Sequence, residues 1–83
     1  MLQIVAMSLL SENMRYLRSR LGYSQQRVAD ELIISRGRYG KYEDAEREPP
    51  IEILLRIAKY YKISVDQLLS VDVRTVILAD NKA

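Results

Sequence analysis

The chain has 83 residues, 48% of them hydrophobic, and a formal net charge of +2. This length suits one domain with a small core. Histidine and cysteine are absent, which excludes disulfides, the common zinc sites, cysteine nucleophiles and serine nucleophiles with a histidine base. With no serine–lysine pair at motif spacing either, we expect no enzyme, no cofactor and no metal.

Residues 1–8 are expected to form an N-terminal extension. Residues 1–6 are apolar, but they are too short to cross a bilayer and lack the basic start of a signal peptide. We therefore expect a cytoplasmic protein with no membrane partner. Two interpretations stay open: either Met7 is the natural start and residues 1–6 are an upstream extension, or these residues form a short strand or helix that packs on a partner.

A first helix is predicted at roughly 11–21. Ser11 is the expected N-cap and Gly22 the expected end. Four apolar residues recur at i, i+4, i+7 and i+11 and predict one buried stripe: Leu10, Met14, Leu17 and Leu21.

Two short helices joined by a tight turn are predicted next, at roughly 25–32 and 36–43. Ser24 and Ser35 are good N-caps for them. In the first of these helices Val28 and Leu32 are expected to be buried, and the small Ala29 lets the second helix cross closely. The second helix carries three cations in its first two turns, the part that a recognition helix inserts into the major groove: Arg36, Arg38 and Lys41.

Basic residues gather in the first half of the chain. Between residues 15 and 41 only Asp30 and Glu31 are acidic, whereas residues 43–52 are mainly acidic. This asymmetry predicts one basic face. Seven basic residues would contribute to it: Arg15, Arg18, Arg20, Arg27, Arg36, Arg38 and Lys41.

Two further helices complete a predicted all-α domain of five helices. Pro49 and Pro50 open the fourth, because a proline in the first turn loses no hydrogen bond. Ser64 and Gln67 have the spacing of a capping box and start a fifth helix that ends near Leu69. Five residues are expected on the inner side of the fourth helix: Ile51, Leu54, Leu55, Ala58 and Tyr61.

The C-terminal tail, residues 70–83, differs from the rest of the chain. Its first part, 71–78, is rich in β-branched residues and is a candidate extended segment. A lone strand is unstable, so an ordered tail should pair with the same tail of a second copy or with the apolar N-terminus. That makes it a candidate dimerisation segment, and a partly disordered end is the alternative.

From about Leu10 to Leu69 the chain resembles the phage-repressor-like (Xre/Cro type) helix-turn-helix family. The resemblance implies a five-helix, lambda-repressor-like DNA-binding domain over residues 9–69. It rests on an ordered set of landmarks: Leu17-Arg18, Leu21-Gly22-Tyr23-Ser24-Gln25, Val28-Ala29 with Leu32, Ser35-Arg36, Tyr42-Glu43, Arg47-Glu48-Pro49, Leu54-Leu55-Arg56-Ile57-Ala58 and Ile63-Ser64-Val65-Asp66-Gln67-Leu68-Leu69.

The resemblance also implies roles for single residues. Arg36, Gly37 and Lys41 match base-facing positions. Arg36 is the first choice for a guanine edge, with a phosphate as the alternative, and Gly37 would act only by allowing close approach. Arg18 and Glu43 match an ion pair that ties the first helix to the end of the third. Five residues are expected at the DNA backbone: Gln25, Ser35, Arg38, Tyr42 and Arg47.

Three of these positions have a competing interpretation or a departure from the family pattern. Gln25 could be a solvated polar cap, and Tyr42 could simply pack in the core. Ile33 stands where the family usually has glycine at positive φ, which is costly for a β-branched residue.

The expected function is that of a sequence-specific regulator of transcription, a repressor or autoregulator. It would bind double-stranded DNA as a homodimer whose recognition helices enter major grooves about 34 Å apart. The alternative is a protein-interaction module or antitoxin-type partner that uses its apolar termini. Fold alone does not separate the two functions.

Overall fold

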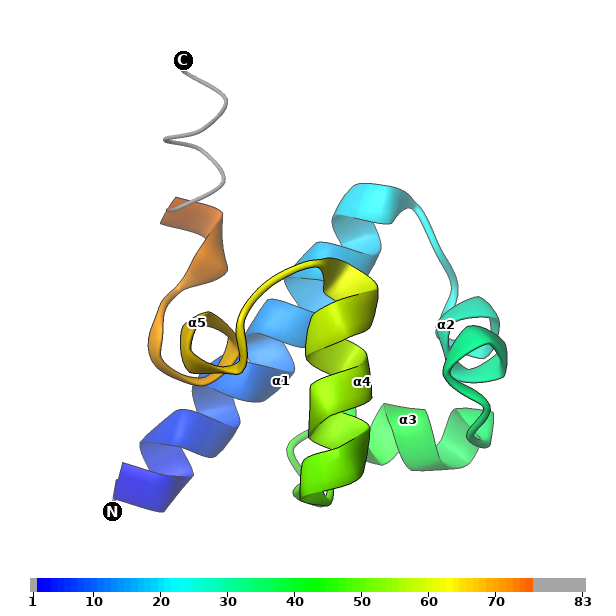
Figure 1. The fold of residues 1–83 in the computed structure, drawn as a ribbon. Helices are drawn as coiled ribbons and strands as arrows, with labels where there is room; N and C mark the ends of the chain where they lie inside the picture. Colours follow the sequence, from blue (N-terminus) through cyan, green and yellow to red (C-terminus); the bar gives the residue numbers. More distant parts are fainter. Residues whose placement is uncertain (1, 76–83) are drawn as a thin grey trace.

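The structure, a computed structural model, describes the backbone of residues 2–75 and the side chains of residues 9–75. Within these residues it contains no strand, so the all-α expectation is confirmed. Its five helices are α1 (Leu2–Leu21), α2 (Gln25–Leu32), α3 (Arg36–Glu43), α4 (Ile51–Tyr61) and α5 (Val65–Ser70), followed by a short helical turn at 73–75 (Figure 1).

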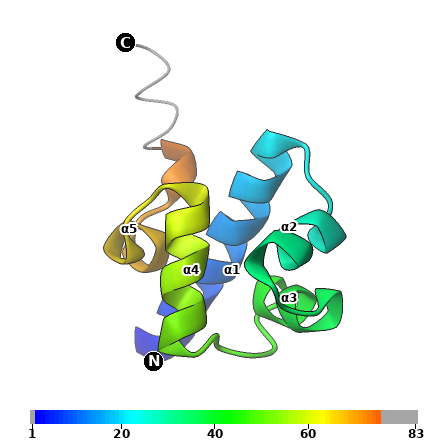
Figure 2. The ribbon, with the colours of Figure 1, turned by 45° about the vertical axis from the view of Figure 1, so that its right-hand side comes forward.

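The helices are arranged around α1 and α4, which lie in the middle of the molecule. The α2–α3 pair lies on one side of them, and α5 with the segment that follows it lies on the other (Figures 1 and 2). The described end of the chain and helix α3 are therefore on opposite sides. No helix within residues 2–75 is both long and apolar enough to cross a membrane.

The first helix is longer than predicted. It begins at Leu2 and runs without a break to Leu21, so Ser11 lies inside it and is not its N-cap. Residues 2–8 accordingly continue α1, which agrees with the helical alternative and not with a strand. Nothing between Leu2 and Leu10 is glycine or proline, and a serine caps a helix only where the preceding backbone leaves the helical conformation. The end is as expected, because Gly22 adopts φ +71° there.

Serine caps begin α2, α3 and α5, as predicted. The hydroxyls of Ser24, Ser35 and Ser64 accept hydrogen bonds from backbone N–H groups three residues later, at 3.0, 3.1 and 3.0 Å. Pro50 takes the capping position of α4 without a side-chain hydrogen bond. Each serine hydroxyl satisfies one of the free N–H groups in the first turn of its helix.

The buried stripes agree with the sequence in part. In α1, Leu10, Met14 and Leu17 are buried, but Leu21 is 48% exposed because the helix ends beyond the core. In α4, Leu54, Ala58 and Tyr61 are buried as expected. The other two expected residues, Ile51 and Leu55, are exposed, and the core uses Ile53 and Ile57 instead. The apolar residues of α4 allow two overlapping stripes, and packing against α2 and α5 selects one of them.

The segment after α5 is fastened to α1 and is not extended throughout. The buried amide of Asn13 donates to the carbonyls of Leu68 (2.8 Å) and Val71 (2.7 Å) and accepts from the N–H of Val73 (3.2 Å). Residues 73–75 are helical and Val73 is fully buried. The predicted extended tail is thus wrong for residues 73–75. The remainder of that prediction, 76–78, lies outside the described residues.

Candidate nucleic-acid interface

Helix α3 has one buried and one exposed face. Tyr39, Tyr42 and Glu43 are buried. At 3.6 residues per turn, Gly37 and Lys41 lie in the middle of the opposite face. Arg36 flanks them on the side of α2, and Arg38 flanks them on the side of the loop before α4. The structure therefore leaves the three residues predicted to face bases and the adjacent Arg38 exposed, and it places Gly37, Arg38 and Lys41 along one groove.

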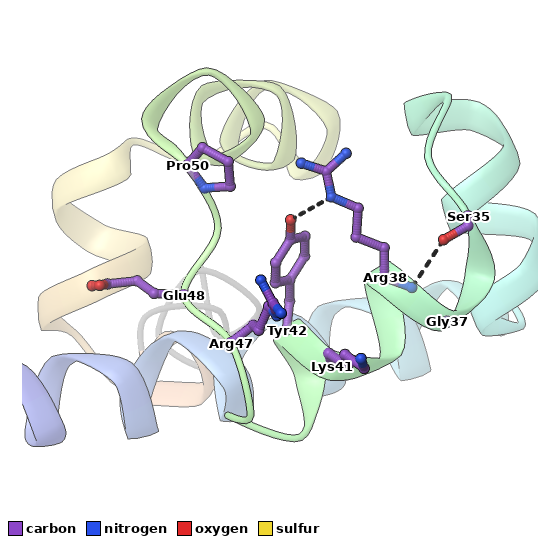
Figure 3. A pocket seen from close by; sticks show the side chains of 8 residues that line it. All are labelled: Ser35, Gly37, Arg38, Lys41, Tyr42, Arg47, Glu48 and Pro50. Atoms are coloured by element: carbon purple, nitrogen blue, oxygen red, sulfur yellow. Dashed lines mark hydrogen bonds between the residues drawn. The ribbon is translucent and has the colours of Figure 1, made fainter.

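A groove of about 590 Å³ runs between this face and the α3–α4 loop. In Figure 3, the side chains of Arg38 and Tyr42 point toward one another on the α3 side of the groove, and Arg38 Nε donates to the Tyr42 hydroxyl at 2.9 Å. Arg47 approaches the groove from the loop, whereas Glu48 points away from the Arg38–Tyr42 pair. The full lining is Ser35, Gly37, Arg38, Lys41, Tyr42, Arg47, Glu48 and Pro50.

The residues predicted at the DNA backbone differ in how free they are. Arg47 is exposed, and no hydrogen bond or ion pair involves its side chain within the described residues. The Ser35 hydroxyl accepts from the Arg38 N–H, as a helix cap does. Tyr42 is only 2% exposed, so its ring packs in the core, and its hydroxyl accepts a hydrogen bond from Arg38, which also lines the groove. The burial agrees with the core interpretation of Tyr42, and its contact with the DNA backbone stays a prediction.

The predicted single basic face is smaller than the sequence suggested. Arg15 and Arg18 pair with Glu43, Arg15 also pairs with Asp44, and Arg27 pairs with Glu31. These cations are engaged within the protein. The basic surface at α3 is built from Arg36, Arg38, Lys41 and, from the loop, Arg47.

The turn between α2 and α3 keeps its geometry although it lacks the expected glycine. Ile33 adopts φ 61° and ψ 46°, the left-handed conformation that usually favours glycine. The next N–H, that of Ile34, bonds to the carbonyl of Ala29 at 3.0 Å and closes the helix end. The Ile33 side chain is 84% exposed, so burial gains little there. Backbone hydrogen bonds from Ile33 and Ile34 to carbonyls of α2 close the turn around this residue.

The predicted ion pair between α1 and α3 is confirmed. Arg18 Nε lies 2.6 Å from Glu43 Oε2, and Arg18 Nη2 donates to Glu43 Oε1 at 3.0 Å. The Glu43 side chain is completely buried. Burial alone would raise the pKa of Glu43, but hydrogen bonds from Arg18, Gln25 and Tyr39 outweigh it, so this pKa is lowered from its ordinary value.

Gln25 also reaches this buried carboxylate. Its Nε2 donates to Glu43 Oε1 at 3.0 Å, so the side-chain amide expected at a phosphate is turned toward α3. The backbone of Gln25 still occupies the first position of α2, where free N–H groups favour an anion.

Two contacts of the same region were not anticipated. Arg15 Nη2 donates to the backbone carbonyl of Glu43 at 2.9 Å. Arg15 precedes Arg18 by three residues in α1, and this spacing indicates that the two side chains lie on the same face of the helix. The hydroxyls of Tyr39 and Tyr61 share a buried hydrogen bond of 2.7 Å between α3 and α4. Burial raises the pKa of Tyr61 to about 12. No sequence spacing predicts that pair.

The chain shares sequence with known regulators. Residues 14–68 match the family model described as Helix-turn-helix. The SPbeta prophage-derived uncharacterized HTH-type transcriptional regulator YonR of Bacillus subtilis is 41% identical over 61 residues, which are 74% of this chain and 56% of that protein. The HTH-type transcriptional regulator ImmR of the same organism is 32% identical over 63 residues, 76% and 50% of the two chains.

A phage protein matches as well. The cryptic phage CTXphi transcriptional repressor RstR of Vibrio cholerae is 37% identical over 59 residues, 71% of this chain and 53% of that protein. The chain thus spans about half the length of these curated relatives. No solved structure matches it significantly. The family match covers α2, α3 and α4 completely, and the chain therefore belongs to the phage-repressor-like (Xre type) helix-turn-helix family.

Proposed function

We propose that this chain is a sequence-specific regulator of transcription that reads the major groove of double-stranded DNA with α3. The observation that carries the proposal is the exposed face of α3. Arg36 and Lys41 flank Gly37 there, and within the described residues no hydrogen bond or ion pair involves the two cationic side chains. Unengaged cations on a short helix can reach base edges and phosphates.

The arrangement assigns different tasks to the two flanks of α3. Arg36 would donate two hydrogen bonds to a guanine edge, and Lys41 would contact a neighbouring base. Gly37 leaves the space that brings the helix axis close to the bases. On the other flank, the groove lined by Arg38, Tyr42 and Arg47 would hold a backbone phosphate, with Ser35 at its edge.

The relatives support a repressor or autoregulator. Those named above include a prophage-derived regulator and a phage repressor. We propose a cytoplasmic homodimer that places two copies of α3 about 34 Å apart on a near-palindromic operator. Its contacts would come from the chain ends, because the end of the described chain lies on the side opposite α3 (Figure 1).

The direct test is selection of bound sequences from a random duplex pool at near-physiological salt, followed by titration of the selected site and a scrambled one. We expect a two-fold symmetric site. Arg36→Ala should lower discrimination at one base pair by about 1–3 kcal/mol. Lys59→Ala, which removes an exposed cation on α4, is the matched control and should change nothing. Weak, uniform and salt-sensitive binding by the parent would contradict sequence-specific regulation.

The dimer needs a separate measurement. Val73 is buried, so a deletion should begin after Thr75 to leave the core intact. We expect the full chain to sediment as a dimer and the shortened chain as a monomer. Identical sedimentation of the two would remove the C-terminal tail from the dimer proposal.

A further inference from the structure

The side chain of Gln25 lies along α3. Its Nε2 donates to Glu43 Oε1 at 3.0 Å, and its Oε1 lies 3.4 Å from where a Cβ on Gly40 would be. Positions 40 and 43 are one helical turn apart, on the side of α3 that faces α2. The amide of Gln25, the first residue of α2, therefore lies against two successive turns of α3, at positions 40 and 43.

The acceptor of this hydrogen bond is itself held rigidly. Glu43 is fully buried and receives two hydrogen bonds from Arg18 of α1. A hydrogen bond to an ionised group in such surroundings is stronger than one between neutral groups. Gln25 thus links the start of α2 to the carboxylate of Glu43 in α3, which Arg18 of α1 also bonds.

The neighbouring glutamine offers a contrast within the same turn of helix. Gln26 Nε2 donates to Asp30 Oδ1 at 2.8 Å on the exposed surface. Both partners belong to α2, so this bond fixes nothing outside that helix. Of these two amides, that of Gln25 is the one that bonds to the other helix of the helix-turn-helix.

We propose that Gln25 is a positioning residue for DNA recognition, whose amide, held by Glu43, sets the spacing between the start of α2 and the reading face of α3. This inference rests on the proposed function. Phosphate contacts set the register of a protein on DNA, and base contacts read the sequence. Loosening α2 against α3 therefore degrades reading of the operator, whereas the general attraction to phosphates stays.

The two possible roles of Gln25 make opposite predictions for unrelated DNA. A residue that donates to a phosphate contributes to binding of the operator and of a scrambled duplex alike. A positioning residue contributes only where α3 must meet particular base edges. Comparing the two duplexes therefore separates the roles.

The experiment compares Gln25→Met with Gln26→Met, titrated against the selected operator and a scrambled duplex. Methionine keeps the length of the side chain and removes the amide. We expect Gln25→Met to bind the operator about tenfold more weakly, with scrambled binding within about twofold of the parent. Gln26→Met should match the parent on both duplexes, and thermal unfolding should show that both variants fold.

Two outcomes overturn the inference while leaving the proposed function intact. An equal loss on both duplexes would make Gln25 a phosphate ligand, and no loss on either would mean that its bond to Glu43 has no role in DNA recognition. Failure of the proposed function would give a different result: the parent protein itself would bind operator and scrambled DNA equally well.

A second measurement follows the amide itself. The side-chain N–H signals of Gln25 can be assigned in ¹⁵N spectra by their absence in Gln25→Met. One of the two amide N–H groups bonds to Glu43, and we expect its chemical shift and its slow exchange with water to be the same in the free and operator-bound protein. Loss of that slow exchange on binding, with the signals of Gln26 unchanged, would show that the amide leaves Glu43 and would overturn the inference.

Discussion

The two faces of α3 differ in how their polar groups are used. On the buried face, Glu43 bonds to Arg18 and Gln25, and the Tyr39 hydroxyl bonds to Tyr61. On the exposed face, Arg36 and Lys41 have no such partner within the described residues. One helix of eight residues thus carries a fixed side and a free side. Apart from the Gln25 bond proposed above, changes on the first should act mainly on stability, and changes on the second should act mainly on DNA binding.

The largest effect is expected from Arg18→Ala. It leaves the buried Glu43 carboxylate without its main partner, which should lower the free energy of unfolding by about 3 kcal/mol or more. Urea denaturation measures the change. Arg20→Ala removes an exposed cation of the same helix and is the control. Equal midpoints for Arg18→Ala and the parent would show that the fixed side of α3 does not depend on this pair.

Acid should weaken the same pair with both side chains in place. Because the pKa of Glu43 in the folded protein lies below its ordinary value of 4.5, the stabilisation is fully present above that pH. It is lost as pH falls through the lower, folded-state pKa. Denaturation midpoints measured across this acidic range should fall more steeply for the parent than for Glu43→Gln. Parallel curves would contradict the prediction.

Tyr39→Phe should cost about 1–2 kcal/mol of stability, because the buried Tyr61 hydroxyl loses its partner. Tyr60→Phe is the matched control. Its hydroxyl bonds to Glu31 at the surface, where water can replace the lost partner. Thermal unfolding of the two variants should therefore rank Tyr39→Phe well below Tyr60→Phe, and the reverse order would be evidence against a role for the buried pair.

Ile33→Gly should stabilise the protein by about 1 kcal/mol, since glycine adopts positive φ without strain. Lys62 ends α4 with φ 58° and is not β-branched, so Lys62→Gly should stabilise less. Chemical denaturation of both variants gives the comparison. A loss of stability in Ile33→Gly would mean that the turn carries no strain.

The smallest change in stability is expected from Gly37→Ala, which should change stability and DNA binding in opposite directions. A Cβ at Gly37 would meet nothing within 4 Å, so Gly37→Ala should stabilise α3 by up to about 1 kcal/mol. The same methyl group would stand between the helix and the bases and weaken operator binding. Denaturation and titration of one variant measure both effects. Stabilisation with unchanged DNA binding would place the reading face elsewhere on α3.

The site residues illustrate how far sequence reasoning reaches. Arg18 and Glu43 were predicted as a pair, and the structure brings them together. Gln25 was predicted at the right position, the start of α2, but its amide has a partner that no spacing in the chain indicates. Its contact with Glu43 depends on how α2 crosses α3, which is a property of the packed molecule.

Local signals in the sequence were enough to determine where α2, α3 and α5 begin. The Ser24, Ser35 and Ser64 caps satisfy N–H groups within three residues of themselves, so no distant part of the chain is needed. The left-handed residue at Gly22 works in the same local way. The sequence alone therefore determined the helix-turn-helix and the cations that it presents.

Only the tertiary structure decided which apolar stripe of α4 is buried, where α1 begins and how residues 73–75 continue. Ile53 and Ile57 replace Ile51 and Leu55 in the core because their side of α4 meets its neighbours. Hydrogen bonds of Asn13 hold the segment after α5 against α1, and the bond to Val73 joins residues that are 60 positions apart in the sequence. Burial and long-range hydrogen bonds depend on which surfaces meet, and that is not encoded in any short stretch of sequence.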